Sequence, residues 1–124
     1  VPPQKPRPWI NLGLAREQTG DIHGAFAAQQ TALALAFQPR LTPYQQNFSQ
    51  MASQTNLARL LAEHGHEEAA ERLLTNVVAQ VPHFPHSLWN LAVLYARTGR
   101  CEQGRPLAHR ARQLDASFAE LVCQ

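Results

Sequence analysis

The sequence lacks both a long apolar run and a strong excess of charge of one sign. No apolar stretch approaches the roughly 20 residues that a membrane-spanning helix needs. The formal net charge of +2 is too small for the basic stripe expected of a nucleic-acid-binding domain. We therefore expect no direct membrane insertion and no nucleic acid partner. The expectation is a soluble domain, with nothing to decide between the cytoplasm and the periplasm.

Cysteine is scarce as well, with only Cys101 and Cys123 in the chain. Small disulfide-stabilised scaffolds are much denser in cysteine, so we interpret both side chains as small, partly buried apolar groups. Cys101 falls near the start of an expected helix, and the following segment returns only about two turns from the far end of that helix. The remaining gap of roughly 10 Å exceeds the Cα reach of a disulfide, so we predict that the two cysteines do not bond within one chain.

Signatures of catalysis and metal binding are missing too. The chain has no G-x-S-x-G, no phosphate-binding glycine loop and no H-E-x-x-H. His23, His64, His66 and Cys101 fall at turns on one edge of the expected fold, but their spacing matches no known metal cluster. We therefore predict no enzyme activity, no cofactor and no metal site, and solvated histidines at these turns.

The composition that is present is that of a folded domain. Apolar residues make up 44% and charged residues 16%, a globular rather than a disordered balance. The start differs, because four prolines within residues 1–8 predict an extended linker over residues 1–7. The start also lacks the apolar core of a signal peptide, and we interpret it as cut from a longer protein. Residues 8–124 are expected to form one domain.

A repeat organises these residues. The pattern Asn-Leu-small, six residues, then Gly occurs at 11–20, 56–65 and 90–99. The second and third copies are offset by 34 residues, whereas the first and second are offset by 45, which is 34 plus 11. A period of 34 residues with two helices per unit is the spacing of tetratricopeptide repeats.

Further columns agree across the three units. Trp9, Leu12 and Gly13 reproduce a W-x-x-L-G opening, and Pro82 closes the second unit. Small or β-branched residues recur five and twelve positions after each glycine, namely Ala25, Ala70 and Gly104, and then Ala32, Val77 and Ala111. The sequence therefore resembles the tetratricopeptide repeat family over about residues 8–115.

The resemblance implies an all-α, right-handed α-solenoid of three antiparallel helix pairs, with repeats at about 8–37, 43–82 and 86–115. The expected helices are 8–19, 22–37, 43–64, 67–80, 86–98 and 103–114. Ser117 and Glu120 form a capping-box pattern, which predicts a seventh, capping helix over 118–123 that covers the last pair. Pro106 predicts a late start for its helix, near residues 103–105, because proline is disfavoured beyond the first turn.

Eleven extra residues precede the second unit. Thr42-Pro43-Tyr44-Gln45 combines an N-cap, a first-turn proline and a glutamine three residues after the cap. No helix breaker follows until Gly65, so we predict one long helix that ends at Gly65 with a positive φ. An inter-repeat loop with its own short helix is the alternative.

The candidate binding residues begin with one column of asparagines, Asn11, Asn56 and Asn90. In this family that face lines a concave surface, and similar asparagine ladders hold an extended peptide by its backbone. A carboxamide suits this role because it can both donate and accept a hydrogen bond. The resemblance thus implies a protein- or peptide-binding scaffold. The alternative is that these asparagines only cap or hydrate a groove common to the fold.

Residues near the asparagines complete the predicted site: Leu14, Arg59, Glu63, Trp89 and Arg97. Arg59 and Arg97 tilt the groove weakly positive and favour an acidic segment, unless they are solvated or pair with Glu63. Two other functions stay open. One is a regulatory or substrate-holding domain of a larger protein, such as a membrane-bound glycan-assembly protein. The other is a homo-oligomer that stacks through exposed terminal repeats.

Overall fold

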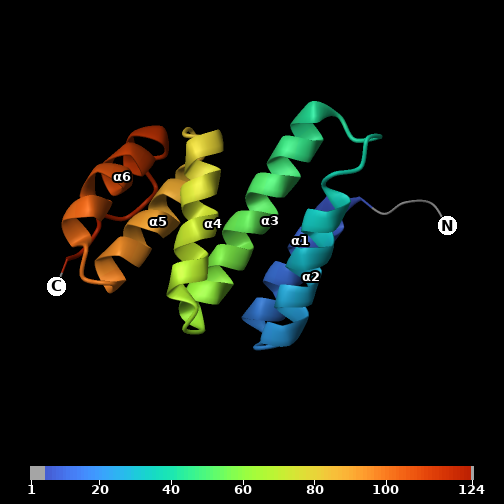
Figure 1. Cartoon of the computed structure of the whole chain (residues 1–124), viewed down its shortest axis with the longest axis horizontal. Coiled ribbons are helices and arrows are strands. Elements are labelled where there is room, and N and C mark those ends of the chain that lie inside the picture. Colours follow the sequence, from blue (N-terminus) through green and yellow to red (C-terminus); the bar gives the residue numbers. More distant parts are fainter. Residues whose placement is uncertain (1–4, 124) are drawn as a thin grey trace. The chain divides into compact units, whose positions relative to one another are not determined.

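The computed structural model describes residues 5–123, which contain six α-helices and no strand (Figure 1). In chain order the helices are α1 (Pro6–Gln18), α2 (Ile22–Leu35), α3 (Pro43–Glu63), α4 (Glu67–Gln80), α5 (Pro85–Arg97) and α6 (Cys101–Leu114). The prediction of an all-α fold is confirmed, and the packing of consecutive helices is compatible with a helical solenoid. The chain divides within α3 into two compact units, residues 1–60 and 61–124, which are described separately.

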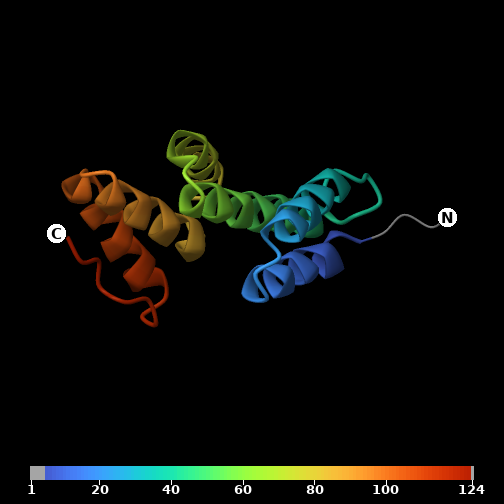
Figure 2. The same cartoon turned by 90° about the horizontal axis from the view of Figure 1, so that it is seen from below.

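In the first unit α1 and α2 pack side by side, as Figures 1 and 2 both show. The contact is made by small side chains, and Ala25, Ala28 and Ala32 are fully buried. Gly13 faces Gln29 so closely that an added Cβ would lie 2.5 Å from Gln29 Nε2. In this pair Ala25 and Ala32, which belong to the small-residue columns of the sequence, are therefore buried where α1 and α2 pack.

The start of α1 differs from the expected boundary. The helix begins at Pro6, two residues before the predicted start, so the predicted linker over residues 1–7 is wrong at Pro6 and Arg7. Proline is well tolerated at the first helical position, because the N–H it lacks has no intrahelical acceptor there. Residues 1–4 of that linker lie outside the described residues.

The extra residues lengthen α3, which is a single helix of 21 residues, as predicted. Thr42 and Gln45 cap its start reciprocally: Gln45 N–H donates to Thr42 Oγ1 at 3.1 Å, and Thr42 N–H donates to Gln45 Oε1 at 2.9 Å. Gly65 follows the helix with a φ of +88°, which confirms the predicted left-handed residue. The alternative of a loop with a short helix is thereby excluded.

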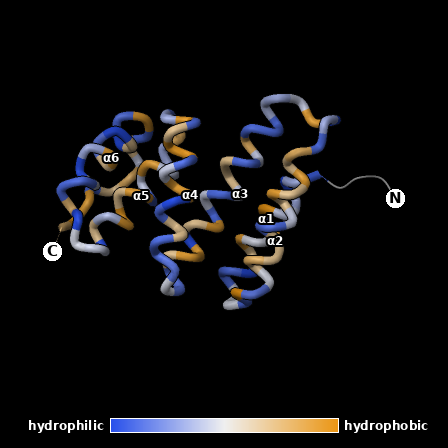
Figure 3. The backbone as a smooth tube through the Cα atoms, in the orientation of Figure 1, coloured by the Kyte–Doolittle hydropathy of each residue, from blue (hydrophilic) through white to orange (hydrophobic). Residues whose placement is uncertain are grey.

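In the second unit α5 packs against both α4 and α6. Its core is leucine-rich, and Leu74, Leu88 and Leu94 are each at most 2% exposed. An added Cβ on Gly104 would lie 2.7 Å from the carbonyl oxygen of Ala92, so α5 and α6 touch at a glycine. Apolar and polar residues alternate along α4 in Figure 3, as expected for a helix with one packed face.

The predicted late start of α6 is wrong. The helix begins at Cys101, directly after Gly99 and Arg100, and continues through Pro106. Pro106 removes the N–H that would have bonded to the carbonyl of Glu102, but both residues are exposed, so water can solvate that carbonyl. One lost helical hydrogen bond is therefore not enough to delay the helix.

The predicted seventh helix is also wrong, because residues 115–123 contain no helix. The capping-box pattern at Ser117 does not form. Instead the Ser117 N–H and hydroxyl both donate to Asp115 Oδ1, at 2.9 and 2.6 Å, and lower the pKa of that carboxyl. Glu120, the other half of the expected box, pairs with Arg112 of α6 at 3.1 Å. We call residues 115–123 the C-terminal segment.

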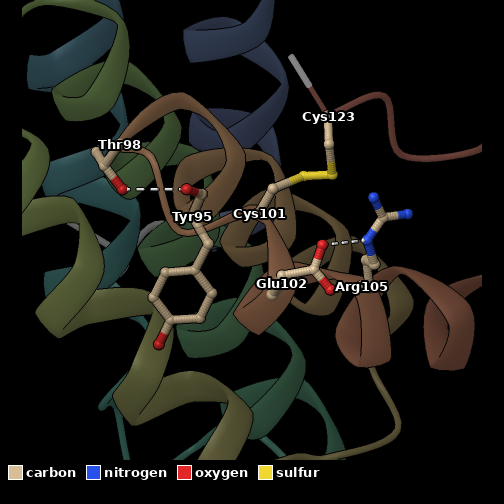
Figure 4. Close-up of a disulfide and its surroundings, with 6 residues drawn as sticks. All are labelled: Tyr95, Thr98, Cys101, Glu102, Arg105 and Cys123. Atoms are coloured by element: carbon tan, nitrogen blue, oxygen red, sulfur yellow. Dashed lines mark hydrogen bonds and ion pairs between the residues drawn. A yellow bond between two sulfur atoms is a disulfide. The ribbon is translucent and has the colours of Figure 1, made fainter.

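A disulfide joins Cys101 to Cys123, with 5.7 Å between the Cα atoms (Figure 4), so the prediction of unbonded cysteines is wrong. The reason is the shape of the C-terminal segment. The 14 residues of α6 are roughly 20 Å long. A nine-residue helix would return only about 13 Å of that length, whereas nine extended residues reach up to about 30 Å. Because the segment is not helical, it is long enough to bring Cys123 back to Cys101 at the start of α6 (Figure 4).

Candidate functional site

The asparagine column is only partly available to a ligand. Asn11 on α1 is exposed, whereas Asn56 on α3 and Asn90 on α5 are half-buried. Asn90 Nδ2 donates to the carbonyl oxygen of His86, one turn earlier, at 2.8 Å. Since one of its two N–H donors already bonds within its own helix, Asn90 has one N–H and its carboxamide oxygen left for a ligand.

Arg59 does not act as an unpaired cation. Its guanidinium grips the carboxylate of Glu17 with both terminal nitrogens, Nη2 to Oε1 at 2.8 Å and Nη1 to Oε2. Both side chains are at least three-quarters buried, so the pair joins α3 to α1 within the first unit. Glu17 therefore neutralises the charge of Arg59, and Arg59 does not add the positive charge that was expected in the groove.

The other predicted residues lie at separate places. Leu14 is half-buried on α1, and Glu63 is exposed at the end of α3. Arg97 is exposed on α5, and its Nη2 donates to the carbonyl oxygen of Ala62 at 3.3 Å. This arginine links α5 to the end of α3 within the second unit.

The face of α5 that was predicted to bind a ligand already holds the chain's own C-terminal segment. The Phe118 ring lies edge-on to His86, with ring centroids 5.2 Å apart, and 5.7 Å from Trp89. From α6, Arg112 Nε donates to the carbonyl oxygen of Phe118 at 3.2 Å. The non-helical backbone at Phe118 is thus held by rings on one helix and by an arginine on the next.

Further along, the same segment leaves a hollow beside α5. A cavity of about 550 Å³ is lined by Trp89, Val93, Ala96 and Arg97 together with residues 120–122 of the C-terminal segment. The Cδ2 atom of Leu121 lies 3.2 Å from the position of an added Cβ on Gly104. Leu121 thus fills the space that a larger residue at position 104 would need.

A second hollow was not predicted. It is a cavity of about 410 Å³ in the first unit, between the start of α1 and the start of α3, and we call it the extension cavity. Tyr44 and Phe48 on one side face Lys5, Pro6 and Arg7 on the other. The sequence signal for it was the unexplained extension itself, which places two aromatic residues one helical turn apart.

Arg100 anchors the turn between α5 and α6. It pairs with Glu71 of α4, with Nη1 3.2 Å from Oε2, and its guanidinium lies 4.8 Å from the Tyr95 ring centroid. The hydrogen bonds from Arg100 lower the pKa of the Glu71 carboxyl, and those to Glu71 raise the pKa of Arg100. These groups support packing of the turn, and none of them belongs to the predicted binding column.

No group of three or more potential metal ligands occurs within residues 5–123. Cys101, one of the turn residues considered in the sequence, is in the disulfide. No helix in the described part of the chain is both long and apolar enough to cross a bilayer. Comparison with protein-family models and with curated proteins found no match to this chain.

Proposed function

We propose that this chain is a non-catalytic scaffold of the tetratricopeptide type that binds an extended peptide segment of a partner protein. The peptide lies on the face of α1 and α3 that carries Asn11 and Asn56. Support for the repeat assignment comes from packing: Ala25, Ala70 and Gly104, five positions after each turn glycine, are all buried. Buried small residues at these positions are what the repeat pattern requires.

The observation that carries the proposal is that the C-terminal segment, which is not helical, lies on α5. It lies against His86 and Trp89, which share or border the face of Asn90, and it is held through a backbone carbonyl as well as through the Phe118 ring. A face of this type therefore accommodates a non-helical chain in at least one helix pair. On α1 and α3 the corresponding residues include the exposed Asn11 and the half-buried Asn56.

The asparagines suit an extended ligand better than a helical one. A helix has already paired its backbone N–H and C=O groups, whereas an extended segment leaves them unpaired. The carboxamides of Asn11 and Asn56 can donate to a ligand carbonyl and accept from a ligand N–H. Recognition of this kind depends on the ligand backbone more than on its side chains.

A selected peptide tests the proposal. Peptides that bind the full chain are isolated from a random display library, and the affinity of the tightest one is measured by calorimetry. We expect Asn56→Ala to weaken binding by about 1 to 3 kcal/mol, because the substitution leaves a desolvated backbone group unpaired. Asn11 is more exposed, so Asn11→Ala should have a smaller effect.

Asn47→Ala is the matched control. Asn47 is an exposed asparagine of the same helix. It precedes Asn56 by nine residues and therefore lies on the opposite side of α3. The proposal fails if Asn56→Ala binds as tightly as the parent chain, or if Asn47→Ala weakens binding equally. Thermal melts of the three variants, which should match, exclude a loss of folding as the cause.

A further inference from the structure

The extension cavity is a separate site at the end of the first unit. Five of its lining residues belong to the extra residues that distinguish the second repeat from the others: Thr42, Tyr44, Gln45, Phe48 and Ser49. We propose that this cavity binds an acidic peptide segment of another protein, which inserts an apolar or aromatic side chain and places a carboxylate beside Lys5 and Arg7. This inference goes beyond the proposed function, because it needs none of the asparagines.

The aromatic wall is exposed. Tyr44 and Phe48 are stacked along one side of α3, with ring centroids 6.2 Å apart and an interplanar angle of 17°. Tyr44 is 72% exposed, so its ring is accessible to a ligand. Leu41 and Ser49, at the base, are buried and give the cavity a packed floor. The volume of about 410 Å³ falls within the range of ordinary ligand sites.

Arg7 is positioned for a carboxylate. Its guanidinium carbon lies 5.4 Å from the centroid of the Phe48 ring. A guanidinium that rests on an aromatic ring uses its face, and its N–H groups point outward from its edge. Such an edge matches the two oxygens of a carboxylate, so Phe48 orients Arg7 without consuming its hydrogen-bond donors.

The charge around the cavity has one sign. Lys5 and Arg7 line it, and no lining residue is acidic. Within residues 5–60 the acidic residues are Glu17 and Asp21. Glu17 lies about 18 Å along α1 from Lys5 and already pairs with Arg59. Asp21 accepts a hydrogen bond from Gly24 N–H as the N-cap of α2. The positive charge at the cavity is therefore uncompensated, which favours an acidic partner.

A minimal ligand pair tests the site directly. The probes are 3-phenylpropionate, which combines one ring with one carboxylate, and 3-phenylpropionamide, its neutral analogue. Each is titrated into the full ¹⁵N-labelled chain, and amide shifts are followed by NMR. We expect shifts centred on residues 5–7 and 44–49, with the acid binding about tenfold more tightly than the amide because charge-assisted hydrogen bonds are the stronger ones. Added salt should reduce this preference.

Two matched pairs of variants complete the test. Tyr44→Ala and Arg7→Gln should each weaken binding of the acid several-fold. Phe37→Ala and Arg40→Gln should not, since these exposed residues belong to the same unit but do not line the cavity. The inference is overturned if the amide binds as well as the acid, if the shifts lie elsewhere, or if no shift occurs at about 10 mM probe, a concentration that detects even millimolar affinity.

Sedimentation of the chain without probe tests whether a second copy of the chain occupies the cavity instead. We expect a monomer at concentrations used for NMR. A dimer that Tyr44→Ala abolishes would show that a second copy of the chain fills the cavity, and it would overturn the assignment to a foreign acidic segment. Neither result bears on Asn56, so this inference and the proposed function can fail independently.

Discussion

Both units bury alanines, but they differ in what they add to them. Among the described residues, each unit also buries larger apolar side chains: Ile10, Leu41, Leu57 and Leu60 in the first, and Leu74, Val77, Leu88, Leu91 and Leu94 in the second. The difference lies in the polar residues, because the first unit buries Gln29, Ser49, Ser53 and Thr55, whereas the second buries only Ser87. The second unit also has the disulfide. Buried hydroxyls in the first unit bond to their own helix, as Ser53 Oγ does to the Ser49 carbonyl at 2.6 Å. Such a bond offsets the free-energy cost of burying a polar group, but it adds little to the net stability of the fold.

The two units also differ in what they leave open. On α5 in the second unit, the predicted binding face is partly covered by the C-terminal segment. In the first unit Asn11 and Tyr44 are exposed, and the extension cavity is open at its surface. We therefore expect the disulfide-linked second unit to be the more stable of the two, and the first unit to present its surfaces to a ligand.

Removal of a leucine from the core of the second unit should have the largest effect on stability. Leu94 is 2% exposed, and Leu94→Ala should reduce the free energy of unfolding by about 3 to 4 kcal/mol through lost burial and the cavity left behind. Leu114→Ala, at a leucine that is 45% exposed, is the control and should change it by less than about 1 kcal/mol. Similar urea midpoints for the two variants would contradict the leucine-core account.

Loss of the disulfide should rank next. Cys101 and Cys123 close a loop with a sequence separation of 22, so Cys123→Ser should lower stability by about 3 kcal/mol. The same change should raise protease cleavage within residues 115–123, because the segment is then held only by Phe118, Leu121 and the Arg112 contacts. Adding reductant to Cys123→Ser should have no further effect. Equal melting of the oxidised and reduced parent chain would contradict this prediction.

A smaller effect is expected where α1 meets α2. Gly13→Ala should cost about 2 kcal/mol, because the new methyl group would lie too close to Gln29 Nε2. That nitrogen also donates to the Ile10 carbonyl oxygen at 3.1 Å. Gln29→Ala removes the obstacle, so Gly13→Ala should cost less in the Gln29→Ala background. Strictly additive effects in a double-mutant cycle would show that the helices do not meet at this point.

The smallest loss of stability is expected for substitutions of the turn glycines, and it should be the same in both units. Gly20, Gly65 and Gly99 have φ values of +86°, +88° and +79°, and nothing lies within 4 Å of an added Cβ at any of them. Gly65→Val should therefore cost slightly more than about 1 kcal/mol from backbone strain alone. Gly20→Val should cost the same, although it lies in the other unit. A neutral Gly65→Val in urea melts would show that the turn does not need a left-handed residue.

The elements that the sequence predicts well are those that depend on neighbouring residues. Thr42 and Gln45 lie three residues apart and bond to each other as the capping pattern requires. Gly65 lies two residues after the end of its helix, so its positive φ could be predicted from local chemistry. The small-residue columns were predictable because the 34-residue period places them at the same point of each pair.

The errors concern contacts over longer distances or competition between local partners. Ser117 had two possible local partners, and Asp115, two residues earlier, binds it in place of a helix N-terminus. The disulfide was missed because its distance was estimated from a helical return that does not form. Arg59 and Glu17 are 42 residues apart, and no periodicity pairs them. The extension cavity likewise depends on how α1 and α3 meet.

The most direct test of the central claim compares two modified forms of a library-selected peptide by calorimetry on the full chain. One form has N-methyl groups on alternate backbone nitrogens, and the other has the same residues in scrambled order. If α1 and α3 hold a peptide by its backbone, N-methylation should weaken binding by more than about tenfold, because each lost ligand N–H leaves an acceptor unpaired. Scrambling should then matter less. Binding that survives N-methylation but is lost on scrambling would contradict the account.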